Sequence, residues 1–179
     1  MMLKELLFNV CKIFEELGVP YALIGGYSAI IYGSPYITRD IDFVTAPEKV
    51  NFELLDKLKN IGLEPTEDYS DIEYFRCFGQ FMHKDTGIVL HIFPEVAGFR
   101  LSRGIELQIK EIEGKKINIC TPEDYLIMRA SVWDDEDKLK AVVLARAQKK
   151  FNLNYLMRRA KEENVTDRIE WIIEEAEIK

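Results

Sequence analysis

Asp40 and Asp42, separated by Ile41, are the residues whose types and spacing point most directly to chemistry. If this segment is a strand, its alternate side chains face the same way, so both carboxylates project together while Ile41 and Phe43 project into the core. Two carboxylates placed like this repel each other unless a cation lies between them. Mg²⁺ suits the position, because it takes one or two carboxylates and completes its shell with water and phosphate oxygens. The pair is a candidate metal site, although an exposed strand edge would carry the same pattern.

A glycine pair, Gly25-Gly26, follows the apolar run Tyr21–Ile24 and opens a short helical segment. Glycine lets the backbone approach a ligand closely. A helix N-terminus offers free N–H groups and a partial positive charge, which suit a phosphate. Ser28 adds a hydroxyl, and Tyr27 could stack on a base. A plain turn, with Tyr27 as a packing residue, is the alternative interpretation.

Residues 23–42 together resemble the signature of the nucleotidyltransferase superfamily, in which a Gly-Gly or Gly-Ser pair precedes an Asp-x-Asp. The sequence Thr38-Arg39-Asp40-Ile41-Asp42 is most similar to the minimal nucleotidyltransferases and the AbiEii-type toxin group. A looser resemblance extends through residue 150. The resemblance implies a polymerase-beta-like nucleotidyltransferase fold.

The same resemblance implies transfer of a nucleoside monophosphate from a nucleoside triphosphate to an acceptor. Asp40 and Asp42 are then catalytic residues and hold Mg²⁺ (or Mn²⁺). Gly25, Gly26 and Ser28 bind the β- and γ-phosphates. The acceptor, which is a protein, an RNA or a small molecule, is not named by any motif.

Two further residues are expected at the nucleotide. Tyr27 lies in the phosphate turn, and Arg39 precedes the aspartate pair. A regular strand points Arg39 to the face opposite the carboxylates. Arg39 then steadies the loop, reaches a phosphate around the edge, or forms a surface ion pair.

His91 marks the departure from the family pattern, because it occupies the position where a third carboxylate is expected. Four interpretations remain open: a base for the acceptor hydroxyl, a ligand in a site that prefers manganese or zinc, a sign of lost catalysis with nucleotide binding retained, or a core histidine with satisfied hydrogen bonds. Glu73 and Glu95 are possible substitute carboxylates, but neither matches the strand position as well.

The apolar spacing predicts an α+β fold with a mixed β-sheet backed by helices and a C-terminal helical region. We expect a core over residues 1–120 and a helical region over 121–179, in which Thr121 and Thr166 cap helices. Pro47 is expected in the first turn of a helix. The expected helices span about 3–17, 27–32, 47–61, 122–132, 136–149, 152–163 and 166–177, and the expected strands 21–24, 40–45, 73–78, 80–84, 88–93, 105–111 and 116–119.

Composition narrows the class of protein. The chain of 179 residues has an apolar fraction of 47%, a formal charge of −7 and apolar runs too short to span a membrane. We expect a cytoplasmic protein. The negative charge weakens the case for a long nucleic-acid substrate, although the basic stretch 146–150 leaves RNA open. Three separated cysteines, Cys11, Cys77 and Cys120, predict buried free thiols.

Three hypotheses follow. The leading one is a nucleotidyltransferase enzyme. The second is a catalytically degenerate module that binds a nucleotide, a protein partner or a second copy of itself, as half of a toxin–antitoxin pair. The third is a purely structural α/β protein, which would place Asp40 and Asp42 far from any cleft.

Overall fold

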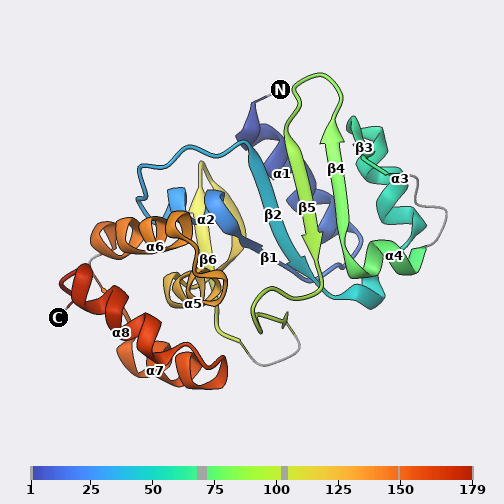
Figure 1. The fold of residues 1–179 in the computed structure, drawn as a ribbon. Coiled ribbons are helices and arrows are strands. Elements are labelled where there is room, and N and C mark those ends of the chain that lie inside the picture. Colours follow the sequence, from blue (N-terminus) through green and yellow to red (C-terminus); the bar gives the residue numbers. More distant parts are fainter. Residues whose placement is uncertain (1, 68–71, 102–104, 149, 179) are drawn as a thin grey trace.

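A seven-stranded mixed sheet forms the centre of the protein in a computed structural model, which describes residues 2–67, 72–101, 105–148 and 150–178 (Figure 1). The strand order is β3-β4-β5-β2-β1-β7-β6. The pairs β2–β5 and β1–β7 are parallel, and the other neighbours are antiparallel. The expected mixed sheet is confirmed. The strands are β1 (Tyr21–Ile24), β2 (Asp40–Thr45), β3 (Leu63–Pro65), β4 (Gly79–His83), β5 (Val89–Phe93), β6 (Leu107–Ile112) and β7 (Lys115–Cys120).

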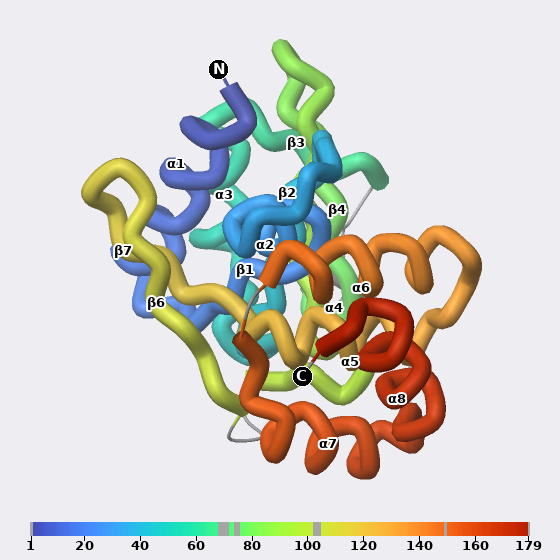
Figure 2. The backbone as a smooth tube through the Cα atoms, turned by 90° about the vertical axis from the view of Figure 1, so that its left-hand side faces the viewer, coloured from blue at the N-terminus to red at the C-terminus, as the bar shows by residue number. Residues whose placement is uncertain are grey.

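Helices cover both faces of the sheet. Helix α1 lies behind the sheet in the view of Figure 1, and Figure 2 shows α5 to α8 gathered together, away from α1. The helices are α1 (Leu3–Glu16), α2 (Gly25–Ile31), the 3₁₀ helix η1 (Pro47–Lys49), α3 (Phe52–Asn60), α4 (Ile72–Cys77), α5 (Pro122–Val132), α6 (Asp135–Ala147), α7 (Leu153–Glu162) and α8 (Thr166–Glu175).

Strand β2 separates an apolar face from a polar one. Ile41 and Phe43 are fully buried, and the Phe43 ring packs edge-on against Phe14 of α1, with 5.1 Å between ring centroids. Asp40 and Asp42 are half-buried on the other face, because side chains alternate along a strand. The core therefore fixes the direction of both carboxylates.

Helix α5 follows β7 almost without a linker. Thr121 caps the helix as expected, since its hydroxyl accepts a hydrogen bond from the Asp124 backbone N–H at 3.1 Å. Pro122 stands in the first turn, where its missing N–H leaves no helical bond unmade. The close connection ties α5 to the end of a central strand. The division into residues 1–120 and 121–179 stays a prediction.

Residues 72–77 form helix α4, so the strand expected over 73–78 is wrong. Side chains at a helical spacing of three meet there, since Arg76 Nη1 forms an ion pair with Glu73 at 2.5 Å. Arg76 Nε also donates to the Val50 carbonyl at 3.3 Å. These contacts favour one helical turn over an extended segment.

Two helix starts and one cysteine also differ from expectation. Pro47 belongs to the separate helix η1, because Asn51 caps α3 by accepting from the Leu54 N–H at 3.0 Å. Val165, not Thr166, occupies the N-cap of α8, because the preceding turn brings the Val165 N–H to the Ala160 carbonyl. Cys77 is exposed, whereas Cys11 and Cys120 are buried.

Candidate active site

Asp42 lies at the centre of the polar face. Its backbone pairs with Ile24 on β1 and with His91 on β5. Paired residues on adjacent strands project to the same side. The parallel β2–β5 register therefore places His91 directly beside Asp42, although 49 residues separate them in sequence.

The His91 ring is held by a hydrogen bond and by two aromatic rings. Its Nδ1 lies 2.8 Å from Asp42 Oδ1, with side-chain exposures of 22% for His91 and 18% for Asp42. The ring stacks on Phe78, with centroids 5.7 Å apart and an angle of 27°, and tilts against Phe93. Because an ionised Asp42 only accepts, we assign the proton to Nδ1, which leaves Nε2 able to accept one. The arrangement can orient an imidazole base.

Gly25 allows helix α2 to begin directly against Asp42. Its φ of +69° lies in the left-handed region, and an added Cβ would stand 2.0 Å from Asp42 Oδ2. A Cβ on Gly26 would come within 3.0 Å of the Thr38 Cβ. The glycine pair thus serves the close approach of α2 to β2, and any side chain at residue 25 would displace the carboxylate.

Ser28 and Tyr27 point away from the solvent side of this turn. Ser28 is fully buried, and its hydroxyl donates to the Gly25 carbonyl at 2.7 Å. Tyr27 packs partly against the core, and burial raises its pKa, with Lys4 and Glu113 close enough to act on it. Within the described residues, Tyr27 is not among those lining the pocket beside Asp42.

Asp40 and Arg39 stand at the open end of β2. Arg39 is exposed, Asp40 is half-buried, and the Asp40 N–H donates to Thr38 Oγ1 at 3.2 Å. In the part of the chain that the structure describes, neither side chain has a hydrogen bond or ion pair. Both charged groups are therefore available to a ligand.

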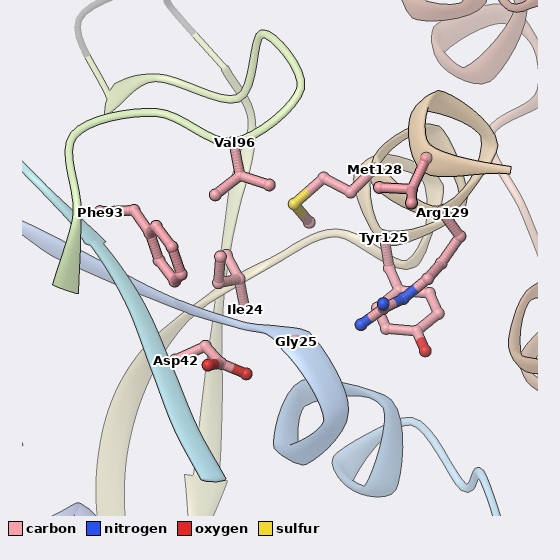
Figure 3. Close-up of a pocket in the computed structure, with 9 residues that line it drawn as sticks. Ile24, Gly25, Asp42, Phe93, Val96, Tyr125, Met128 and Arg129 are labelled. Atoms are coloured by element: carbon pink, nitrogen blue, oxygen red, sulfur yellow. The ribbon is translucent and has the colours of Figure 1, made fainter. Parts of the chain in front are cut away.

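A pocket of about 230 Å³ opens beside Asp42, between the ends of β1, β2 and β5 and one side of α5 (Figure 3). Its walls are mostly apolar. Figure 3 shows Asp42 and Arg129 approaching it from opposite walls. Its lining residues are Ile24, Gly25, Asp42, Phe93, Val96, Tyr125, Met128, Arg129 and Val132.

The donor set fits a cation that brings most of its own ligands. Among the described residues, no group of three or more His, Cys, Asp or Glu side chains is gathered as a metal cluster. Asp40 and Asp42 on one strand face match the one or two carboxylates that Mg²⁺ uses beside water and phosphate. The possible substitute carboxylates are engaged elsewhere: Glu95 pairs with Arg100 and Glu73 with Arg76.

The α5 wall was not anticipated from the sequence. Tyr125, Met128, Arg129 and Val132 recur at i, i+3, i+4 and i+7, which places them on one side of a helix. The available signal was Arg129, a charged residue in an otherwise apolar stripe. Its meaning depends on β1 and β5, which are distant in sequence.

Solved nucleotidyltransferases share this fold at low sequence identity. The lincosamide antibiotic adenylyltransferase LnuA, in a lincomycin-bound crystal structure, is 18% identical with a TM-score of 0.56, over 78% of this chain and 94% of that one. A nucleotidyltransferase-like protein from Paracoccidioides brasiliensis is 14% identical with a TM-score of 0.64, over 99% and 93%. The antibiotic-resistance factor ANT(2'')-Ia is 12% identical with a TM-score of 0.60, over 93% and 94%.

Sequence comparison supplies the family. A comparison with curated proteins found no match. Residues 3–176 match the model of a family described as nucleotidyl transferase of unknown function (DUF2204). This match spans nearly the whole chain and agrees with the fold and with the Gly-Gly and Asp-x-Asp elements. The chain therefore belongs to this nucleotidyl transferase family.

Proposed function

We propose that the protein transfers a nucleoside monophosphate from a nucleoside triphosphate to a hydroxyl group of an acceptor molecule. The observation that carries the proposal is the placement of the Asp42 carboxylate between His91 and the Gly25 turn. LnuA is an adenylyltransferase for lincosamides, and ANT(2'')-Ia has been crystallised with adenylyl-2"-tobramycin. These neighbours favour a small-molecule acceptor over a protein or an RNA.

Each site residue has a proposed role. Asp40 and Asp42 would hold Mg²⁺ or Mn²⁺, which, when bound, offsets the charge of the phosphates. The backbone N–H groups at the start of α2 would bind the β- and γ-phosphates, with Ser28 stabilising the turn from inside. The exposed Arg39 is proposed to contact a phosphate. Tyr27 would support helix α2 by packing against the core.

The proposed reaction is a substitution at the α-phosphorus. The acceptor oxygen forms the new P–O bond, and the bond to pyrophosphate breaks. His91 takes the hydroxyl proton on Nε2, while Asp42 holds the ring through Nδ1. In this proposal, His91 stands where the family pattern has a third carboxylate. It acts as a base and not as a metal ligand.

Calorimetry and a labelling assay test the proposal. We expect the purified protein to bind ATP or another nucleoside triphosphate with Mg²⁺ or Mn²⁺, and to transfer label from the α-phosphate to a compound in a small-molecule extract. Asp42→Asn should lower the rate of transfer by about 10³-fold, while Asp56→Asn, an exposed substitution on α3, should leave it unchanged. Absence of nucleotide binding to folded wild-type protein would refute the proposal.

His91, in place of the expected third carboxylate, favours one second candidate: a nucleotide-binding module without transferase activity. In that role it would form one half of a toxin–antitoxin pair. The variant His91→Asp separates the two. A loss of transferase activity identifies His91 as the base, whereas activity that appears only in the variant identifies the natural protein as degenerate.

A further inference from the structure

The pocket beside Asp42 has the size and position of a binding site for a small reacting molecule. Its volume of about 230 Å³ exceeds the roughly 150 Å³ of an apolar cavity that admits benzene. It lies below the roughly 300–1,000 Å³ of typical drug-sized sites. One substituted aromatic ring is therefore the appropriate scale of ligand.

The walls of the pocket select for an apolar body. Ile24, Phe93, Val96, Met128 and Val132 supply aliphatic and aromatic carbon on both sides. Burying an aromatic ring among such side chains is favourable in proportion to the apolar area removed from water. A strongly hydrated sugar would find few polar partners along these walls, because the polar side chains of the lining are Asp42, Tyr125 and Arg129.

Arg129 presents its guanidinium to the far wall while an ion pair with Asp137 holds the group in place. Its Nη1 donates to Asp137 Oδ1 at 2.7 Å, and the guanidinium lies 5.0 Å from the Tyr125 ring centroid. A guanidinium has five N–H donors in a planar fork. Its Nε is enclosed without a hydrogen-bond partner among the described residues. Figure 3 shows the group directed toward the pocket.

The charges at the two ends of the pocket select the ligand. An anionic group of the ligand would meet Arg129, since planar carboxylates match the guanidinium fork. A cationic group at the same end would find no acceptor on Arg129, because a guanidinium only donates hydrogen bonds. At the opposite end, beside Asp42, lies the proposed reacting centre.

We propose that this pocket binds the acceptor, and that the acceptor is a small aromatic hydroxyl compound carrying a carboxylate, which Arg129 holds. The inference rests on the proposed transferase function and names its substrate class. The hydroxyl oxygen would attack the α-phosphorus, pyrophosphate would leave, and the hydroxyl proton would pass to His91. The resulting product is a phosphodiester of the acceptor and the nucleoside.

Three probes of nearly the same size test the charge preference. They are 3-(4-hydroxyphenyl)propanoate, 4-ethylphenol and tyramine, which are anionic, neutral and cationic. In the presence of ATP and Mg²⁺, binding and transfer of label should be strongest for the propanoate and weakest for tyramine. We expect a difference of about tenfold in affinity between these two probes.

Variants of α5 locate the site. Arg129→Lys should reduce the preference for the propanoate, because it keeps the charge and loses the fork. Since changes at Arg129 disturb its bond to Asp137, Val132→Trp provides a second route. Val132 is exposed and lines the pocket, so Trp should block probe binding while ATP binding persists. Leu139→Trp, an exposed change on α6 outside the lining, is the matched control.

The outcomes separate the two proposals. If folded protein fails to bind ATP, the proposed function fails, and the acceptor assignment fails with it. If ATP binds but tyramine binds as well as the propanoate, or the propanoate competes with ATP, only the acceptor assignment is overturned. Competition would instead assign the pocket to the nucleobase.

Discussion

Two aspartates, Asp42 and Asp124, lie within the same molecule in opposite situations. Asp124 on α5 has a side-chain exposure of 1% and accepts from Thr121 Oγ1 at 3.0 Å, Tyr155 Oη at 2.5 Å and Arg159 Nε at 3.0 Å. Asp42 has 18% exposure and borders the pocket. Among the described residues, the carboxylate of Asp42 has one hydrogen-bond partner, His91.

The number of protein donors separates the two roles. Asp124 is saturated by its neighbours and joins α5 to α7, so its carboxylate has little capacity left for a ligand. Asp42 uses one oxygen for His91 and keeps the other against the Gly25 turn. The comparison teaches that an acid whose oxygens are all buried and hydrogen-bonded by the protein has a structural role. An acid that borders a pocket and has few protein donors is a candidate reacting centre.

The largest expected effect is on catalysis. Asp42→Asn should lower the transfer rate by about 10³-fold, which corresponds to about 4 kcal/mol of transition-state stabilisation. Its free energy of unfolding should change by less than about 1 kcal/mol, because the amide keeps the shape of a half-exposed side chain. Steady-state transfer assays and urea denaturation measure the two quantities. A stability loss as large as that of Asp124→Asn would erase the contrast.

The opposite pattern is expected at the buried network. Asp124→Asn leaves the Arg159 guanidinium, with 3% side-chain exposure, without its buried counter-charge, which should destabilise the protein by about 3 kcal/mol. The control Glu162→Gln removes a partly exposed partner of Arg159 and should cost less than about 1 kcal/mol. Urea denaturation ranks the two variants, and equal losses would contradict the role assigned to Asp124.

Substitution of Gly25 sharpens the comparison by moving Asp42 without removing it. Gly25→Ala should destabilise the protein by about 1–3 kcal/mol through its left-handed backbone, and should also lower transfer by displacing the carboxylate. Gly18→Ala is a matched control, since its φ is +61° and no atom lies within 4 Å of an added Cβ. Both variants should lose stability, and only Gly25→Ala should lose activity relative to folded protein.

The smallest expected effect concerns the buried thiols of Cys11 and Cys120. Burial raises the pKa of Cys11 and of Cys120 from 9.0 to about 12. These groups therefore stay protonated in the folded state at pH 7 and at pH 9, whereas their unfolded forms ionise near pH 9. Iodoacetamide should label Cys77 alone in folded protein at both pH values, and all three cysteines in urea. The Cys120 Sγ lies 3.7 Å from the Ser28 hydroxyl of α2, so labelling of folded Cys120 at pH 9 would show that α2 opens away from β7.

The same reasoning gives a pH trend for stability. Because the folded pKa of each buried thiol is raised, the stability it supports is complete below the unfolded pKa and decreases as pH rises from about 9 toward 12. Urea denaturation at pH 7 and pH 10 should show a lower free energy of unfolding at the higher pH. Cys11→Ser and Cys120→Ser should reduce this difference.

Sequence reasoning reached the part of the site that is encoded locally. The glycine pair, the aspartate pair and the alternation that aims Asp40 and Asp42 together all lie within residues 25–42, and the fold class followed from periodic segments. The strand expected over 88–93 is also local, and in β5 Val89, His91 and Phe93 alternate with buried neighbours.

The remainder depends on long-range contacts. The alternation in residues 72–77 fits either a strand or a single helical turn, and the contact of Arg76 with the Val50 carbonyl decides for the helix. The residues of α5 line the pocket because α5 packs beside the ends of β1 and β5, which are distant in sequence. Arg129 alone was too weak a signal to identify this wall, because a charged residue on a helix is most often solvated.

Helices α2 and α5, which form two sides of the candidate site, follow directly after one pair of adjacent parallel strands. Strand β1 runs into α2 at Gly25, and β7 runs into α5 after Thr121. Because each helix begins within two residues of the end of its strand, both sides of the site start from the same parallel pair. If α5 lines the acceptor site as proposed, substitutions along α5 should alter the choice of acceptor and leave Asp40 and Asp42 in place. Under the proposed function, the reaction would then depend on β2 and β5, and the choice of substrate on α5.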